Sequence, residues 1–188
     1  MEQSTLSAPL VRKFSALFAR CDRNGDGVLS EEDFRAQAQH IQQIFGWADD
    51  DRRTKRLFAD RGELFHRLVS GADKDRSGTV SLPEFLRYFE RQIVVFRAAG
   101  AASPWLLSSC RDLIDLIDQD NSGSICAEEF AKLLSAQGSS ADAATLFGKL
   151  DRNGDGRLTL DELLALSFEF MTSDDPQAPG NQFFCGDF

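Results

Sequence analysis

The 188-residue sequence is poor in several residues on which particular functions depend. It has two methionines, two histidines, two tryptophans and one tyrosine, and its 30 acidic residues outnumber its 21 basic residues, for a formal net charge of −9. Binding to phosphate groups needs clustered Lys and Arg, so we expect neither nucleic acid nor an anionic membrane surface as a partner. An excess of acid is typical of a soluble surface or of cation binding.

Long apolar runs are also missing. No stretch approaches the roughly 18–20 apolar residues that a membrane helix needs, so we expect no membrane span. Residues 1–13 lack a basic region followed by an apolar run, so we expect no signal peptide. The cysteines, Cys21, Cys110, Cys126 and Cys185, show no CxxC or zinc-type spacing. We therefore expect reduced thiols in a cytoplasmic protein, with disulfides left open at this point.

Four segments of twelve residues repeat one pattern. They are residues 22–33 (DRNGDGVLSEED), 73–84 (DKDRSGTVSLPE), 118–129 (DQDNSGSICAEE) and 151–162 (DRNGDGRLTLDE). Each has oxygen-bearing side chains at the first, third and fifth places, glycine at the sixth, an apolar residue at the eighth and an acid at the twelfth. Self-similarity of this kind predicts a repeated structural unit.

The spacing within each segment suits a hard cation. Calcium takes six to eight oxygens at about 2.3–2.6 Å, and a twelve-residue loop supplies them from side chains at places one, three, five and twelve and from the carbonyl of place seven. The predicted ligands are Asp22, Asn24, Asp26, Val28, Asp33, Asp73, Asp75, Ser77, Thr79, Glu84, Asp118, Asp120, Ser122, Ser124, Glu129, Asp151, Asn153, Asp155, Arg157 and Glu162. In this prediction the seventh-place residues, Val28, Thr79, Ser124 and Arg157, bind through their backbone carbonyls. We expect up to four Ca²⁺ ions as cofactors.

Apolar residues flank each loop at helical spacing. Before the loop that starts at Asp118, Cys110, Leu113, Ile114 and Ile117 line one face of a predicted helix. The exiting helices begin their apolar faces at Phe34, Phe85, Phe130 and Leu163. The eighth-place residues, Leu29, Val80, Ile125 and Leu158, are predicted to join short strand pairs between neighbouring loops. The sequence thus predicts helix, loop and helix four times, the pattern typical of EF-hands.

Loop spacing and the C-terminal segment narrow this prediction. The loops start unevenly, at residues 22, 73, 118 and 151, and residues 174–184 read DDPQAPGNQFF. In these features the chain resembles the sarcoplasmic calcium-binding protein and calexcitin group, whose relatives include calerythrin and the luciferin-binding proteins. The resemblance implies an all-α fold in which two EF-hand pairs pack as one compact globule beneath a tail that folds back onto the core. We place the pairs at residues 1–97 and 104–173 and the tail at 174–188, with a hinge in the small-residue segment 98–105.

The twelfth place separates the first loop from the other three. The twelfth residue of the first loop is Asp33, whose side chain is one methylene shorter than those of the twelfth residues in the other loops, Glu84, Glu129 and Glu162. A shorter acid favours one bound oxygen rather than two, and hence a six-coordinate shell closer to the preference of Mg²⁺. We therefore expect this site to be the weakest for calcium or to be a mixed Mg²⁺/Ca²⁺ site. Residues 151–162 match the strict loop pattern in full.

The scarcity of methionine bears on the biological role. Sensors of the calmodulin type expose a methionine-rich groove when calcium binds, whereas this chain has two methionines and 16 phenylalanines. Phenylalanine favours a closed core, so we expect a monomeric intracellular Ca²⁺ buffer that also takes some Mg²⁺. A sensor that signals to a protein target and a calcium-regulated carrier of a small apolar ligand stay open as alternatives. We do not expect an enzyme, because nucleophile motifs such as GxSxG and SxxK are absent and His66 lacks an identifiable partner.

Overall fold

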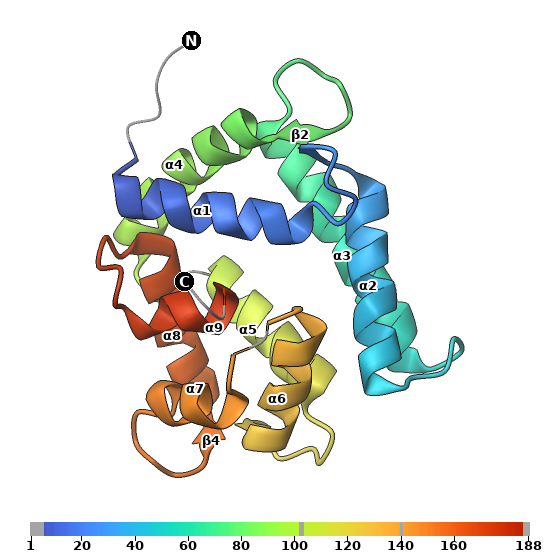
Figure 1. Cartoon of the computed structure of the whole chain (residues 1–188), viewed down its shortest axis with the longest axis vertical. Helices are drawn as coiled ribbons and strands as arrows, with labels where there is room; N and C mark the ends of the chain where they lie inside the picture. Colours follow the sequence, from blue (N-terminus) through green and yellow to red (C-terminus); the bar gives the residue numbers. More distant parts are fainter. Residues whose placement is uncertain (1–5, 102–103, 140, 186–188) are drawn as a thin grey trace. The chain divides into compact units, whose positions relative to one another are not determined.

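The computed structural model describes residues 6–101, 104–139 and 141–185, and these are mostly helical. The elements are α1 (Ala8–Cys21), β1 (Val28–Leu29), α2 (Glu31–Phe45), α3 (Arg52–Ala72), β2 (Val80–Ser81), α4 (Leu82–Ala99), α5 (Pro104–Ile117), β3 (Ile125–Cys126), α6 (Ala127–Ala136), α7 (Ala143–Leu150), β4 (Arg157–Leu158), α8 (Leu160–Thr172) and α9 (Pro179–Cys185) (Figure 1). The all-α fold with four helix–loop–helix units is thus confirmed. Parts of the predicted segments 1–97, 98–105 and 174–188, together with the side chain of Cys185, lie outside the described residues.

The chain divides into two compact units, Met1–Gln92 and Ile93–Phe188. The division falls within α4, because that helix continues without a break to Ala99. No single helix of the described residues is long and apolar enough to cross a membrane, although α4 and α5 pass that test by length and composition when the bent pair is taken together.

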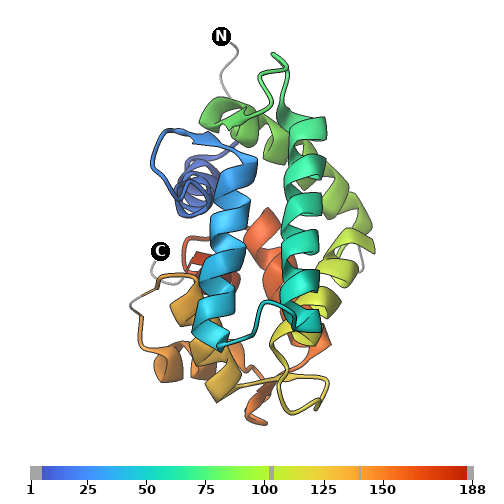
Figure 2. The same cartoon turned by 90° about the vertical axis from the view of Figure 1, so that its right-hand side faces the viewer.

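Phenylalanine rings form much of the core of the first unit. Phe14 on α1 stacks on Phe89 of α4 with ring centroids 4.5 Å apart. Phe34 on α2 and Phe65 on α3 lie 5.4 Å apart, and these two helices run side by side (Figure 2). Gly46 ends α2 in the left-handed conformation, with φ of 68°, which glycine adopts without strain. The apolar faces of the four helices therefore close over one interior.

The second unit contains the end of α4 and the helices α5 to α9. Its entering and exiting helices pack in the pairs α5 with α8 and α6 with α7. Between α5 and α8, the thiol of Cys110 and the hydroxyl of Ser167 form a buried hydrogen bond of 3.3 Å. Cys21, Cys110 and Cys126 are free thiols.

The C-terminal helix α9 lies against α8 and α7 (Figure 1). Phe183 is 1% exposed, and its ring stacks at 6.3 Å on that of Phe130. A Cβ atom at Gly180 would lie 2.3 Å from the carbonyl oxygen of Leu166, so only glycine allows this approach. The amide of Asn181 donates to two carbonyls of the turn before α9, those of residues 175 and 176. The segment after α8 is thus part of the core of the second unit.

In each unit the two loops meet through a pair of short antiparallel strands. Leu29 of β1 lies opposite Val80 of β2, and Ile125 of β3 lies opposite Leu158 of β4. All four side chains are fully buried. The predicted strand pairing at the eighth place is confirmed, and it holds the two loops of each pair side by side.

Candidate metal-binding loops

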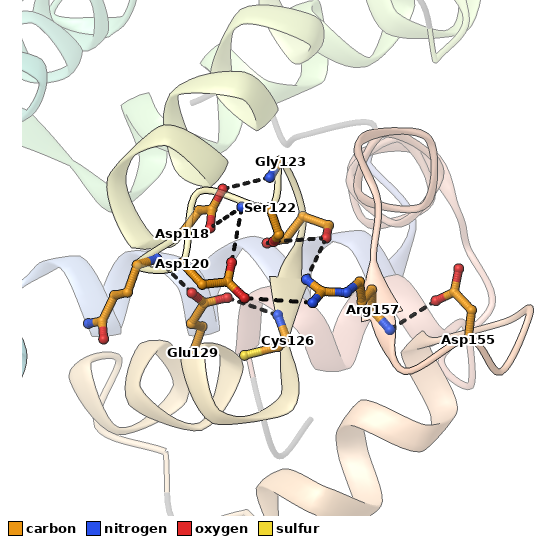
Figure 3. A network of polar contacts seen from close by, with 10 residues as sticks. Asp118, Asp120, Ser122, Gly123, Cys126, Glu129, Asp155 and Arg157 are labelled. Carbon is orange, nitrogen blue, oxygen red and sulfur yellow. Dashed lines mark hydrogen bonds and ion pairs between the residues drawn. The ribbon is translucent and has the colours of Figure 1, made fainter.

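The first-place aspartate organises the turn of each loop. In the loop from Asp118, its carboxylate accepts the N–H of Ser122 at 3.1 Å and that of Gly123 at 2.7 Å (Figure 3). The equivalent bonds to the sixth-place glycines join Asp22 to Gly27, Asp73 to Gly78 and Asp151 to Gly156 at 2.8–2.9 Å. The sixth-place glycines have φ of 78–85°, in the left-handed region. The loop backbone is therefore bent around the carboxylate predicted to be the first ligand.

The twelfth-place acid closes each loop from the other side. Glu129, 4% exposed, accepts the N–H of Gln119 with Oε1 at 2.6 Å and the N–H of Cys126 with Oε2 at 2.9 Å (Figure 3). The acids of the other loops accept N–H groups from the same two places, namely Arg23 and Ser30 for Asp33, Lys74 and Ser81 for Glu84, and Arg152 and Thr159 for Glu162. Each acid thus joins the second place of its loop to the ninth.

Two loops gather three carboxylates. Among the described residues, Asp73, Asp75 and Glu84 each place one oxygen within 4.8 Å of the others, and Asp118, Asp120 and Glu129 do the same. Hard cations such as Ca²⁺ prefer oxygen ligands at this kind of spacing. These two sets fit the ion that the spacing in the sequence predicts.

The first and fourth loops replace the third-place carboxylate with an amide. In the first loop the Asn24 amide donates to a carboxylate oxygen of Asp26 at 2.9 Å, while its own oxygen accepts the Asp26 N–H at 2.9 Å. In the fourth loop, Asn153 and Asp155 make the same two bonds, at 3.1 and 2.8 Å. The third-place and fifth-place oxygens therefore lie beside each other in both loops.

The fifth and seventh places are also neighbours in the second and third loops. The hydroxyl of Ser77 donates to the carbonyl of Thr79 at 3.3 Å, and that of Ser122 to the carbonyl of Ser124 at 3.1 Å. In the other two loops, the N–H of Val28 donates to Asp26 and that of Arg157 to Asp155. In every loop, hydrogen bonds thus link some of the predicted ligands, while three carboxylates gather within 4.8 Å of one another in the second and third loops. The assignment of individual ligands stays a prediction.

Hydrogen bonds favour the ionised form of several loop acids. Burial of Glu84 alone would raise its pKa, but bonds from the Ser81 hydroxyl and from the N–H groups of Lys74 and Ser81 lower the pKa overall. For Asp120, the hydroxyl of Ser122 is the largest cause of a lowered pKa, and the charge of Arg157 adds to it. These acids of the second and third loops therefore favour the negatively charged form, which attracts cations.

Two features of the loops were missed in the sequence. The hydroxyls at the ninth place, Ser30, Ser81 and Thr159, donate to the twelfth-place acid at 2.6–2.8 Å. Residues at the ninth and twelfth places form capping boxes at the starts of α2, α6 and α8, and the S-x-x-D/E and T-x-x-E patterns would have revealed those of α2 and α8. The second feature is the guanidinium of Arg157, which leaves its own loop; nothing in the sequence pattern indicates its direction.

A helix, a twelve-residue loop and a second helix, repeated twice and joined through eighth-place strands, define an EF-hand pair. The chain matches the family of the EF-hand domain pair over residues 12–90 and 108–167. It therefore belongs to the EF-hand family of calcium-binding proteins, in the group of calerythrin.

Individual relatives agree with this assignment. Calerythrin of Saccharopolyspora erythraea is 34% identical over 155 residues, which cover 81% of this chain and 86% of calerythrin. The structure of a sarcoplasmic calcium-binding protein from amphioxus superposes with a TM-score of 0.72 at 21% identity, covering 96% of this chain and 98% of that one. Coelenterazine-binding protein from Renilla muelleri gives a TM-score of 0.71 at 22% identity, with coverage of 95% and 98%. The two structures support the fold.

Proposed function

We propose that this EF-hand protein acts as an intracellular calcium buffer that binds up to four Ca²⁺ ions, one in each loop. In each loop the predicted side-chain ligands would bind the ion from places one, three, five and twelve, and the seventh-place carbonyl would complete them. Binding would supply a divalent charge that compensates the loop carboxylates. The acidic surface and the free thiols of Cys21, Cys110 and Cys126 support a reducing, cytoplasmic setting.

The burial of the apolar side chains carries the proposal of a buffer. Within the described residues, Phe14, Phe34, Phe65, Phe130 and Phe170 are all at most 5% exposed. Buried aromatic rings hold a core in one shape, whereas a sensor must expose an apolar groove to its target when calcium binds. Because these rings are buried in the core, we expect the protein to bind ions with little change in its exposed apolar surface.

The first loop is the proposed site for Mg²⁺. Asp33 reaches the same two backbone N–H groups as the longer glutamates of the other loops. Because aspartate is one methylene shorter, we infer that this loop lies closer to the start of α2, which would favour a smaller ion and a six-oxygen shell.

Calorimetry and dye binding test the buffer together. Titration with calcium at fixed millimolar Mg²⁺ should show four binding sites, and binding of a hydrophobic dye and the hydrodynamic radius should change little between chelated and calcium-loaded protein. A large rise in dye fluorescence on calcium addition would overturn the buffer in favour of a sensor. If fewer than four sites are found, some loops do not bind calcium. The variants Glu84→Gln, Glu129→Gln and Glu162→Gln would identify these loops, because a substitution in a loop that does not bind calcium removes no binding step.

A calcium sensor is the second candidate, and one observation favours it. Val94 and Val95, adjacent on α4, are 69% and 54% exposed. Paired exposed valines are a small contact surface for a protein target, so the dye experiment is repeated with Val94→Ser and Val95→Ser. If both substitutions abolish a calcium-induced rise in dye binding, the sensor is supported.

A carrier of an apolar ligand would need a dry, enclosed cavity. In the described part of the first unit, an open cavity of about 430 Å³ is lined by Gln42, Asp49, Thr54, Lys55 and Phe58. This cavity is open to solvent rather than enclosed, so it does not favour an apolar ligand.

A further inference from the structure

The side chain of Arg157 crosses from its own loop to the neighbouring loop of the same unit. Its Nη1 donates to the hydroxyl of Ser124 at 3.1 Å, and its Nη2 lies 3.6 Å from Oδ2 of Asp120 (Figure 3). The strand pairing explains the direction, since Arg157 lies opposite Cys126 in the β3–β4 register. The seventh residue of the fourth loop thus places its charge at the third loop.

Both contacts involve places that the third loop uses for its ion. Asp120 is the predicted third-place ligand, and Ser124, which Arg157 contacts through the hydroxyl, is predicted to supply the seventh-place carbonyl. An arginine stays protonated at any working pH, so its positive charge attracts a carboxylate as a metal ion does. A calcium ion in this loop must therefore share the Asp120 carboxylate with a guanidinium and must bind close to a like charge.

We propose that Arg157 lowers the calcium affinity of the loop 118–129 by competing for Asp120 and repelling the ion, so that this loop fills at higher calcium than the loop 73–84. The inference rests on the proposed binding of calcium by the third loop. Residue 157 then has two separate roles, because its backbone carbonyl serves the fourth loop while its side chain acts on the third.

The second loop is a natural reference for the third. It carries the same side-chain types at places one, three, five and twelve, namely Asp73, Asp75, Ser77 and Glu84. In its strand pair the counterpart of Arg157 is Val28, which lies opposite Ser81 as Arg157 lies opposite Cys126. Val28 is uncharged, so the two loops differ in the charge that the neighbouring loop presents.

The first experiment removes the charge from Arg157. Calcium titrations of the full chain are compared for wild type and Arg157→Gln, with Glu129→Gln used to identify the binding step of the third loop. We expect Arg157→Gln to tighten that step by about three- to tenfold at low salt, and by less at 0.5 M salt, because the interaction is between exposed, screened charges.

Lys132→Gln is the matched control. Lys132 on α6 is exposed and donates to the side chain of Gln119 at 2.9 Å, so it lies beside the third loop without touching a predicted ligand. Lys132→Gln removes the same unit of charge as Arg157→Gln. We expect it to change the calcium affinity of the third loop by less than half as much as Arg157→Gln does. Equal effects of the two variants would overturn the specific pairing with Asp120.

The reverse exchange installs the charge in the other unit. We expect Val28→Arg to weaken the binding step of the second loop, identified with Glu84→Gln, by about the same factor. A second readout does not depend on measuring an affinity. In NMR spectra, the side-chain NH resonances of Arg157 in the chelated protein should shift when calcium fills the third loop. Unfolding in chelator verifies that every variant is folded.

The outcomes separate the inference from the function on which it rests. If Glu129→Gln removes no binding step, the third loop does not bind calcium, and both proposals fail for that loop. If Glu129→Gln removes a step that Arg157→Gln leaves unchanged, calcium binding stands and the role of Arg157 is overturned. Side-chain resonances of Arg157 that do not shift on calcium addition would also overturn the role of Arg157.

Discussion

Exchanging the twelfth-place acids of the first and second loops is the sharpest test of how the loops choose an ion. Asp33 accepts the N–H groups of Arg23 and Ser30 at 2.9 and 2.8 Å and the Ser30 hydroxyl at 2.7 Å. Glu84 makes the corresponding three bonds at 3.0, 3.0 and 2.6 Å. The same three kinds of donor thus surround the two carboxylates, although Asp33 also accepts the N–H of Asn24 at 3.4 Å and is buried where Glu84 is half-buried. The variants Asp33→Glu and Glu84→Asp differ from wild type by one methylene each.

The size of the effect follows from that methylene. An added carbon–carbon bond moves the carboxylate by about 1.5 Å, which is more than the difference between a typical Mg–O and Ca–O bond. In Asp33→Glu both oxygens can then face the ion, so we expect calcium to bind about tenfold more tightly at the first loop, roughly 1.4 kcal/mol, and Mg²⁺ to compete less. In Glu84→Asp we expect the opposite change at the second loop.

Calorimetric titration with calcium, with and without millimolar Mg²⁺, measures both quantities in each variant. Asp33 is 1% exposed, so the added carbon also has to be accommodated, and thermal unfolding in chelator separates that packing cost from the change in binding. The reasoning is refuted if Asp33→Glu leaves calcium affinity and Mg²⁺ competition unchanged while its stability in chelator matches wild type.

Three further predictions concern stability and pH. Gly180→Ala should lower the free energy of unfolding by about 1–3 kcal/mol, since its Cβ would lie 2.3 Å from the Leu166 carbonyl oxygen, while Gly148→Ala, which meets nothing within 4 Å, should be neutral or slightly stabilising in urea denaturation. Leu158→Ala should cost about 2–4 kcal/mol, because Leu158 is fully buried against Ile125 across the strand pair; an unfolding curve that matches wild type would contradict the packing. In chelated protein, the pKa of Glu84 is lower in the folded state than its ordinary value of 4.5, so ionised Glu84 stabilises the fold at pH values above 4.5. This stability is lost as the pH falls through the folded-state pKa. Urea denaturation from about pH 6 to 3 should therefore show a loss of stability that Glu84→Gln reduces.

The helices and loops could be predicted because their signals are local. Twelve-residue spacing, sixth-place glycines such as Gly123 and apolar faces beginning at residues such as Phe130 each depend on neighbours in the sequence. The strand pairing of Ile125 with Leu158 was predicted for the same reason, since the eighth place repeats in all loops.

Features that depend on neighbours in space were not visible in the sequence. The need for glycine at residue 180 arises from the backbone of Leu166 and Phe170 on α8, which lie 14 and 10 residues earlier in the chain. The direction of the Arg157 side chain follows from the strand register, and a seventh-place side chain has no preferred direction in the loop pattern itself. The loop pattern therefore assigns a role only to the carbonyl of the seventh place.

The twelfth-place acid links ion binding to the start of the exiting helix. In α2, α6 and α8 this acid is the N3 residue of a capping box, and its carboxylate also accepts the N–H of the second loop residue. A carboxylate oxygen has two lone pairs, so an oxygen that accepts one N–H keeps a lone pair for a cation. In α6 each oxygen of Glu129 accepts one N–H, so this acid can bind the ion without leaving the cap, and α6 has little reason to swing. In α2 and α8 the cap oxygen of Asp33 and of Glu162 also accepts the ninth-place hydroxyl, so that hydroxyl has to turn away before the same oxygen binds an ion. Sensors depend on such a swing, so retention of the caps favours the proposed buffer. Hydrogen exchange at the N–H groups of Ser30, Cys126 and Thr159 would contradict this argument if calcium made it faster.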